Sequence, residues 1–302
     1  MTARHGLLLA ALAAIWGASY LLIKYALEDF SAGEIVFLRT LLATVVLVCV
    51  VRVQGGAAWD ALRTAPRVRP GQAVLLGVTA VAAPFLLITI GEKAVPSGLT
   101  AVLIAPASLF VAAFAPLLDR SEAVDRSQAG GLVLGLVGVG LLVGVESVHS
   151  LEAFLGALAI LAASALYALS SFVVKGPFRG VPAIATSAIS CAVATVCVLP
   201  VALLTRHAGA PGLRAVLSVT ALGVVGTALA FVIFYRLIAE IGAGRASLVS
   251  YLAPGVALFY GAVFLDEEIT VAAVGGLALI LAGVGVAGRR RRVAAPEPAL
   301  DA

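Results

Sequence analysis

Apolar residues occur along this chain in long continuous stretches that are separated by short polar segments. Each stretch has roughly 20 residues, which is the length that a helix needs to cross the hydrocarbon core of a bilayer. The strands of a membrane barrel would alternate apolar and polar residues and would be about half as long. The pattern therefore predicts ten transmembrane helices, over residues 6–25, 35–53, 71–91, 97–118, 128–145, 153–174, 182–204, 214–235, 244–264 and 270–288.

The first stretch is expected to stay in the membrane rather than to be removed as a signal peptide. It contains Trp16 and Lys24, and a second apolar stretch follows it where a secreted protein would continue with a polar domain. The longest interval between stretches, residues 54–70, is expected to be a loop.

The basic residues predict an orientation. If the N-terminus is cytoplasmic, 15 of the 20 Lys and Arg residues fall on the cytoplasmic side and 4 on the other, while Arg39 lies inside a helix. Cytoplasmic loops carry such an excess, so both termini are expected to be cytoplasmic in an inner or plasma membrane. The tail 289–302 is expected to be a basic anchor followed by a disordered Pro/Ala segment.

Composition excludes a cytosolic enzyme, a disordered protein and a secreted disulfide scaffold. With 62% hydrophobic and 12% charged residues, the chain has half the charge of a typical soluble domain. The three cysteines lie in apolar stretches and the three histidines are far apart, so neither a disulfide framework nor a metal site is predicted. No phosphate-binding loop of the type Gly-x-x-x-x-Gly-Lys-Ser/Thr occurs. We expect no cofactor and no nucleic-acid partner; the expected partners are a small-molecule substrate and the lipid bilayer.

The two halves of the chain resemble each other. Residues 130–140 and 275–285 are both glycine-rich and are identical at eight of eleven positions. Further pairs follow in the same order, at offsets of 145 to 151: Trp16 with Tyr167, Ser19 with Ser170, Lys24 with Lys175, Glu92 with Glu240, Pro106 with Pro254, and Glu122 with Glu267.

Each half contains five predicted helices, an odd number, so the second half must enter the membrane from the opposite side. The predicted fold class is an all-α polytopic membrane protein with two five-helix inverted-topology repeats, 6–145 and 153–288, joined by a linker at 146–152. Two similar halves of opposite orientation can exchange conformations, so that a cavity between them opens first to one side of the membrane and then to the other. This is alternating access, and the substrate site is expected near the bilayer midplane, where the halves meet.

Several segments resemble a known family. They are Ile15–Tyr20 (IWGASY), Leu38–Ala43 (LRTLLA) and the long stretch Phe234–Pro254, which continues into the second glycine-rich helix. In order and spacing these are similar to the EamA-type ten-helix members of the drug/metabolite transporter superfamily, over residues 6–288. The resemblance implies a transporter of small organic molecules, often an exporter. The chain departs from an even duplication, because helix 182–204 has no arginine that corresponds to Arg39.

Polar, aromatic and proline residues at helical spacing are candidates for a substrate cavity. A proline within a membrane helix frees a carbonyl, which is tolerated beside protein or water, and a polar stripe should face the bundle interior. Alternatively, each hydroxyl bonds to its own helix backbone and each ring only packs. The candidates are Trp16, Ser19, Tyr20, Thr100, Pro106, Ser108, Tyr167, Ser170, Ser247, Ser250, Tyr251 and Pro254.

Two charged residues are candidates for a role inside the membrane, where a charge is costly. Arg39 lies about five residues into a predicted helix; it could contact substrate, pair with an acid such as Glu92 or Glu268, or extend its charged end outward to the interface. Glu92 ends a helix and could take up protons or merely cap a loop. No acidic residue lies near the middle of a predicted helix, so the sequence does not support proton coupling.

Glycine pairs in helix 128–145, Gly131/Gly135 and Gly140/Gly144, permit close helix contact. This contact could be made within the bundle or with a second copy of the chain in a homodimer.

The leading function is a secondary transporter that exports small metabolites or drugs, and no enzymatic activity is predicted. The alternatives are an uptake carrier of the same fold, a non-transporting membrane sensor, or a polytopic membrane enzyme. The enzyme lacks a supporting His-Glu-x-x-His or Gly-x-Ser-x-Gly motif, and the sensor lacks an appended soluble domain.

Overall fold

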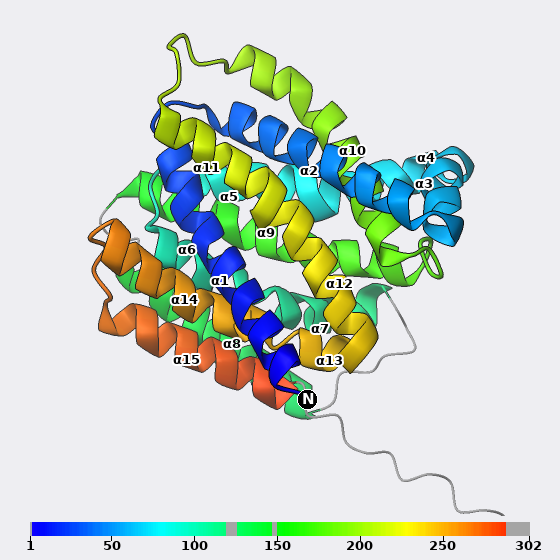
Figure 1. The fold of residues 1–302 in the computed structure, drawn as a ribbon. Helices are drawn as coiled ribbons and strands as arrows, with labels where there is room; N and C mark the ends of the chain where they lie inside the picture. The colour runs from blue at the N-terminus through cyan, green and yellow to red at the C-terminus, as the bar shows by residue number, and fades with distance from the viewer. Residues whose placement is uncertain (1, 119–125, 147–149, 288–302) are drawn as a thin grey trace, which may run out of the picture.

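A computed structural model describes residues 2–118, 126–146 and 150–287. Throughout this part of the chain the regular structure is helical (Figure 1). Its elements are α1 (Ala3–Ala26), α2 (Ala32–Gln54), α3 (Gly56–Val68), α4 (Pro70–Gly77), η1 (Val78–Ala82), α5 (Ala83–Gly91), α6 (Ser97–Ile104), α7 (Ala107–Leu118), α8 (Arg126–Glu146), α9 (Leu151–Lys175), α10 (Ala183–Leu204), α11 (Leu213–Gly223), η2 (Val224–Leu229), α12 (Ala230–Ile241), α13 (Ala243–Ala246), α14 (Val249–Phe264) and α15 (Val271–Ala287).

The helices make this a polytopic membrane protein. Seven helical segments of the described chain are long and apolar enough to cross a membrane, and three shorter apolar helices lie at 129–142, 249–264 and 271–286. Ten spans therefore stay a prediction, although each predicted stretch contains a helix. The predicted tail 289–302 and residues 147–149 of the predicted linker lie outside the described residues.

The expected loop at 54–70 is wrong, because α3 occupies most of it. Gly55 and Gly56 turn the chain with φ values of +62° and +52°, and the helix then runs to Val68 without burying a residue. The guanidinium of Arg52 lies 4.5 Å from the centre of the Trp59 ring. Its sequence, GAAWDALRTAPRV, is amphipathic rather than apolar, which is typical of a helix that lies along a membrane surface. A search for apolar stretches misses such a helix.

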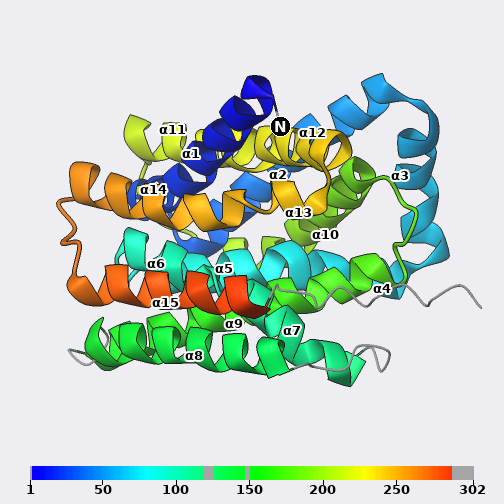
Figure 2. The same ribbon diagram turned by 90° about the horizontal axis from the view of Figure 1, so that it is seen from below.

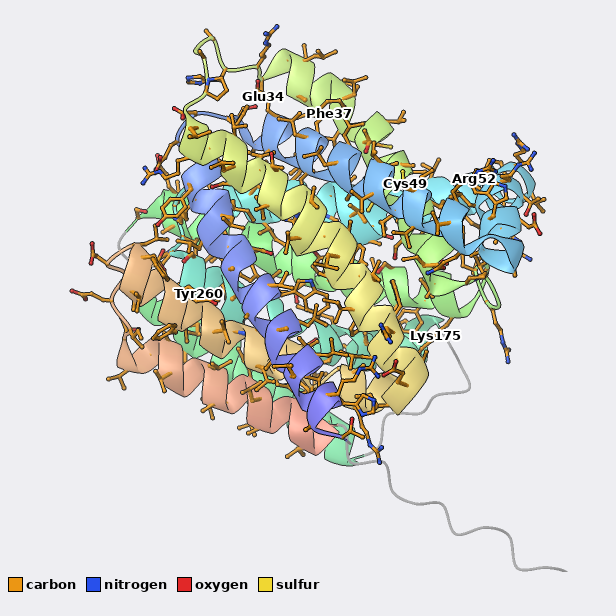
Figure 3. All side chains as sticks on the ribbon, viewed as in Figure 1. Glu34, Phe37, Cys49, Arg52, Lys175 and Tyr260 are labelled. Carbon is orange, nitrogen blue, oxygen red and sulfur yellow. The ribbon has the colours of Figure 1, made fainter. Side chains whose placement is uncertain are left out.

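Local capping sets where α2 begins. The Ser31 hydroxyl accepts a hydrogen bond from the Glu34 amide at 3.2 Å, and the Glu34 carboxylate accepts one from the Ser31 amide at 2.9 Å. This reciprocal pair satisfies two amides that the first helical turn leaves free. Glu34 and Arg52 lie at opposite ends of α2 in Figure 3, with Phe37 and Cys49 between them.

The pattern of neighbouring helices is the same when the two halves are exchanged. In the order of the predicted spans, the second helix packs on the seventh (α2 on α10) and the fifth on the tenth (α8 on α15). The first packs on the ninth and eighth (α1 on α14 and α11), and the sixth packs on the fourth and third (α9 on α6, α7 and α5). These contacts bury the core between the halves rather than within each of them.

Glycines allow close contact between α8 and α15, which lie side by side in Figures 1 and 2. A side chain at Gly283 would come within 2.5 Å of the Gly131 carbonyl oxygen and 2.6 Å of the Gly135 amide nitrogen. Gly131 and Gly135 thus pack within the bundle. Gly140 has open space around it, so a homodimer contact there is still an open prediction.

We expect Gly283→Ala to lower the free energy of unfolding by about 1–3 kcal/mol, because the added methyl group would overlap backbone atoms of α8. Gly285→Ala is the matched control, since it lies on the same helix with nothing within 4 Å of the added carbon. Thermal unfolding of both variants in detergent tests this. Equal midpoints for the two variants would contradict the packing described here.

Candidate functional site

Two π-helical turns interrupt long helices at corresponding places in the two halves. η1 separates α4 from α5, and η2 separates α11 from α12. Shifted by the offset of 148 that relates Glu92 to Glu240, η1 covers residues 226–230 and overlaps η2. A π-helical turn widens the backbone and leaves some groups without their usual partner, and such turns are frequent at functional sites.

Arg39 of α2 is held at the second of these turns. Its Nε donates a hydrogen bond of 2.9 Å to the Thr227 hydroxyl, and that hydroxyl donates one of 2.8 Å to the Leu222 carbonyl oxygen five residues earlier. The guanidinium carbon lies 3.9 Å from the centre of the Phe85 ring of α5. Thr227 thus satisfies a carbonyl of the widened turn and the charged group at the same time.

Besides Phe85, aromatic side chains from the first and second halves lie in the region of Arg39. Tyr20 of α1 and Tyr167 of α9 pack against the same buried cluster, which includes Ile88 and Leu222. Both phenols lie within electrostatic range of the Arg39 guanidinium, as do Cys191 and Glu92. We call Arg39, Thr227, Phe85, Tyr20 and Tyr167 the Arg39 cluster. Its members come from α2, η2, α5, α1 and α9, so it lies where the two halves meet.

The cluster leaves the guanidinium with capacity for another partner. Among the described residues, Thr227 is its one hydrogen-bond partner, and no ion pair joins Arg39 to Glu92 or Glu268. Arg39 is 7% exposed. A guanidinium has five N–H donors, and a carboxylate or phosphate can accept two of them side by side. The arrangement therefore suits an anionic group of a small ligand.

Glu92, at the end of α5, is fully buried at 0% exposure. Both of its carboxyl oxygens have no hydrogen-bond partner. The Lys24 ammonium at the end of α1 donates a hydrogen bond to the backbone carbonyl of Glu92, not to the side chain. This burial could not be read from a sequence in which Glu92 stands at the end of an apolar stretch.

Three predicted cavity hydroxyls bond to their own helices. Ser19, Thr100 and Ser170 donate to the carbonyls of Ile15, Pro96 and Tyr167, at 3.1, 3.0 and 2.8 Å respectively. All three are buried. Trp16 packs against Phe234, with 5.3 Å between ring centres. Each hydroxyl therefore bonds to its own helix and the Trp16 ring packs, as the alternative to a role in the cavity predicts. A role of these residues in transport stays a prediction.

The two matched prolines differ in what they do to the backbone. Pro106 is buried where the helix breaks between α6 and α7, and the Ser164 hydroxyl of α9 donates a hydrogen bond of 3.0 Å to the Ile104 carbonyl beside that break. Pro254 is buried inside the continuous helix α14. In the second half the break lies earlier, between α13 and α14, at Ser247 and Leu248.

The remaining candidates lie away from the Arg39 cluster. Ser108 and Ser250 are exposed, and Ser247 is half-buried. Tyr251 packs against a different buried cluster, with Leu99 and Leu103. Of the predicted site residues, the structure therefore brings Tyr20 and Tyr167 into the region of Arg39, and Glu92 lies within electrostatic range of Arg39. The candidates of helix 244–264 are not among these neighbours.

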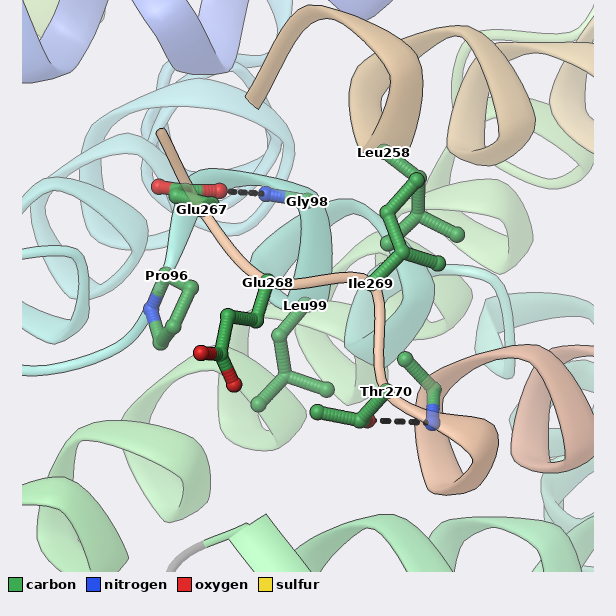
Figure 4. A pocket seen from close by; sticks show the side chains of 9 residues that line it. Pro96, Gly98, Leu99, Leu258, Glu267, Glu268, Ile269 and Thr270 are labelled. Atoms are coloured by element: carbon green, nitrogen blue, oxygen red, sulfur yellow. Dashed lines mark hydrogen bonds between the residues drawn. The ribbon is translucent and has the colours of Figure 1, made fainter. Parts of the chain in front are cut away.

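Two cavities occur near the ends of the bundle. One of about 20 Å³ lies beside the start of α6 (Figure 4). There the Glu267 carboxylate accepts hydrogen bonds from the Ser97 amide and hydroxyl and from the Gly98 amide, at 2.7, 2.9 and 3.0 Å. This acid ties the α14–α15 loop to the start of α6. The other, of about 330 Å³, is lined by residues that include Arg69 and Arg179. Neither includes a member of the Arg39 cluster.

Sequence reasoning missed three residues of this region: Phe85, Thr227 and Cys191. Phe85 and Cys191 look like ordinary core residues in apolar stretches. Thr227 could have been noticed as a hydroxyl in an apolar stretch, but no sequence signal marks the π-helical turn that presents it. The Ser187 hydroxyl of α10 donates a hydrogen bond of 2.9 Å to the Tyr235 hydroxyl of α12, and no sequence signal indicates this pairing between two helices.

Comparison of the sequence and the fold with known proteins identifies the chain as a transporter. The profile of the EamA-like transporter family matches residues 4–144 and again 154–289. The chain therefore belongs to the EamA-like transporter family, as the motifs in its sequence indicate. A solved crystal structure has the same fold, with a TM-score of 0.66 and 20% identity over 95% of this chain and 97% of that chain.

Three relatives cover nearly the whole chain. A protein of Archaeoglobus fulgidus named an uncharacterized transporter is 23% identical over 94% of this chain and 99% of its own length. A probable terminal-alkyne amino-acid exporter of Streptantibioticus cattleyicolor is 26% identical, over 93% and 94%. A probable amino-acid metabolite efflux pump of Salmonella typhimurium is 25% identical, over 94% of each.

We expect Thr227→Val to destabilise the protein by about 1.5–3 kcal/mol, because it removes a hydrogen bond to a buried charge. Thr220→Val is the matched control: its exposed hydroxyl bonds only to the Val216 carbonyl one turn earlier in α11. Thermal unfolding in detergent measures both. A loss no greater than that of the control would show that Thr227 does not hold Arg39.

Proposed function

We propose that this transporter exports small organic metabolites across the cytoplasmic membrane, with the Arg39 cluster as its substrate site. The observation that carries the proposal is a buried guanidinium with unused donors, set among aromatic rings where the two halves meet. An enzymatic activity is not part of the proposal. Both termini lie in the cytoplasm, in agreement with the distribution of basic residues.

The substrate carries a carboxylate or a similar anionic group next to an apolar part. Arg39 binds the anion with two parallel hydrogen bonds, and Phe85, Tyr20 and Tyr167 contact the apolar part. Two relatives named for amino-acid or amino-acid-metabolite export fit this chemistry. We therefore place amino acids and related metabolites first among the candidates.

Transport proceeds by alternating access between two inverted five-helix repeats. The neighbour pattern, which is unchanged when the halves are exchanged, supports this arrangement, as do the double match to the family and the paired π-helical turns. Inverted repeats place the site at their interface, which is where the Arg39 cluster lies.

Helix α1 is tied at both of its ends. At its start, Arg4 and His5 contact the Glu240 carboxylate of α12 at 3.4 and 3.1 Å. At its other end, Lys24 bonds to the backbone of Glu92. Glu92 and Glu240 are matched positions of the two halves. Opening on one side and then the other requires these two attachments to break in turn.

The function is tested with purified protein in liposomes. Vesicles are loaded with an unlabelled mixture of the standard amino acids, and the entry of labelled amino acids by exchange is followed one at a time. We expect saturable exchange of at least one of them. No saturable exchange of any amino acid would reject the proposed substrate class.

We expect Arg39→Gln to reduce that exchange at least about tenfold, because removing a charge-assisted hydrogen-bond pair costs roughly 1.5–3 kcal/mol. Arg179→Gln, an exposed arginine in the turn after α9, is the control and should keep the wild-type rate. Both variants are checked for reconstitution and for their unfolding midpoint. Exchange by a folded Arg39→Gln protein at the control rate would remove Arg39 from the substrate site.

A further inference from the structure

Glu92 has a combination of features that the substrate site does not explain. Its carboxyl group is completely buried, and neither oxygen has a hydrogen-bond partner. An ionised carboxylate in such a place would cost several kcal/mol, whereas a neutral carboxyl group costs far less. A buried acid of this kind is stable either with a proton bound or with a cation beside it.

The charged groups around Glu92 do not supply that cation. Lys24 acts on it most strongly, but its ammonium bonds to the Glu92 backbone and forms no ion pair with the side chain in the described structure. Glu267, on the loop beside α6, adds a second negative charge, and Arg39 of α2 is bonded to Thr227 instead. Tyr20 of α1 and Tyr167 of the packed helix α9 also lie in this region, but a phenol is neutral at neutral pH and supplies no cation.

Glu240, the residue of the second half that matches Glu92, lies in surroundings that suit a charged glutamate. Glu240 is 28% exposed at its side chain and contacts Arg236 of its own helix at 2.9 Å, besides Arg4 and His5 of α1. The same position of the two halves therefore holds one glutamate with cationic partners and one glutamate sealed without any. The duplication makes the difference informative, because both acids end the corresponding helix.

We propose that Glu92 is a proton-binding site, and that its carboxyl group carries a proton whenever the substrate-free bundle is closed around it. On the side to which the site opens, hydronium donates the proton to a carboxyl oxygen, so an O–H bond of hydronium breaks as the carboxyl O–H bond forms and water remains. When the site opens to the other side, the carboxyl O–H bond breaks and a water molecule accepts the proton as hydronium.

Resting on the proposed function, this site gives the carrier a driving force. Because the closed bundle accepts Glu92 only when its charge is neutralised, the substrate-free carrier changes sides with the proton bound. The substrate-loaded carrier returns after the proton has left, with the ammonium group of the amino acid as the cation beside the Glu92 carboxylate. One proton and one substrate then move in opposite directions in each cycle, and an acidic exterior drives export.

Infrared spectroscopy of the purified full chain in lipid nanodiscs tests the proton directly and needs no substrate. At neutral pH we expect the wild-type protein to show the carbonyl stretch of a protonated carboxyl group, which Glu92→Gln should lack. Glu240→Gln, which removes the charged partner of Arg4, His5 and Arg236, should keep this band. No such band in the wild-type protein would overturn the proposal, and so would an unchanged band in Glu92→Gln.

The wild-type spectrum also decides the matter if Glu92→Gln does not fold. Incorporation of isotope-labelled glutamate must shift the band, and a band that does not shift would overturn the proposal. Glu92→Asp offers a second variant, which should keep a protonated carboxyl band at a displaced frequency.

Coupling is measured in liposomes with the membrane potential held at zero and any amino acid that the exchange assay identifies. With one proton per substrate, a difference of one pH unit should sustain a roughly tenfold higher amino-acid concentration on the acidic side for the wild-type protein. Glu92→Gln should show equal concentrations on both sides. Accumulation by this variant would overturn the proposal. Absence of exchange by the wild-type protein would reject the proposed function, while the infrared result would still decide whether Glu92 holds a proton.

Discussion

The hydrogen bond between Arg39 and Thr227 shows the constraint on which the rest of this structure depends. A bilayer supplies no water to charged or polar groups, so each of them needs a partner from the protein. Arg39 finds one only because α2 packs beside η2, and Thr227 is free to accept because its own hydrogen goes to the Leu222 carbonyl of the widened turn. Helix packing, backbone geometry and a buried charge are thus parts of one arrangement.

The glycines let the helices approach closely enough for such partners to meet. A side chain at Gly223, the residue before η2, would overlap the Arg39 carbonyl oxygen at 3.0 Å. A carbon added at its counterpart Gly77, the residue before η1, would lie 3.2 Å from the Ser190 carbonyl oxygen of α10. Each π-helical turn therefore follows a glycine that presses against the helix of the opposite half. The repeated sequence specifies a repeated contact, and only one of the two contacts carries an arginine.

Much of the fold could be predicted from the sequence, because the lipid imposes a simple rule on it. Each predicted apolar stretch contains a helix, and the EamA family follows from motifs whose order is preserved. Helix α3 was missed because its apolar residues occupy one face only. The break at Pro106 follows from proline chemistry, whereas Pro254 remains inside α14 and the corresponding break lies at Ser247 and Leu248. A proline removes one backbone hydrogen bond in either helix, but the sequence alone does not indicate whether the helix breaks there or stays continuous.

The candidate site could be predicted only in part, for a physical reason that Glu92 makes clear. Residue type and depth along a helix indicated that Arg39 is special, but the cost of a charge depends on burial and partners, which only the packed structure supplies. Glu92 lies at the end of α5, where a sequence suggests exposure, yet α9 packs against α5 and Lys24 of α1 bonds to the Glu92 backbone, and the side chain is fully buried. Its repeat counterpart Glu240 keeps three partners and partial exposure. Two acids at matched positions of the sequence thus differ in what an ionised side chain would cost. In the proposed cycle, this asymmetry between the duplicated halves makes the two openings differ in their need for a proton.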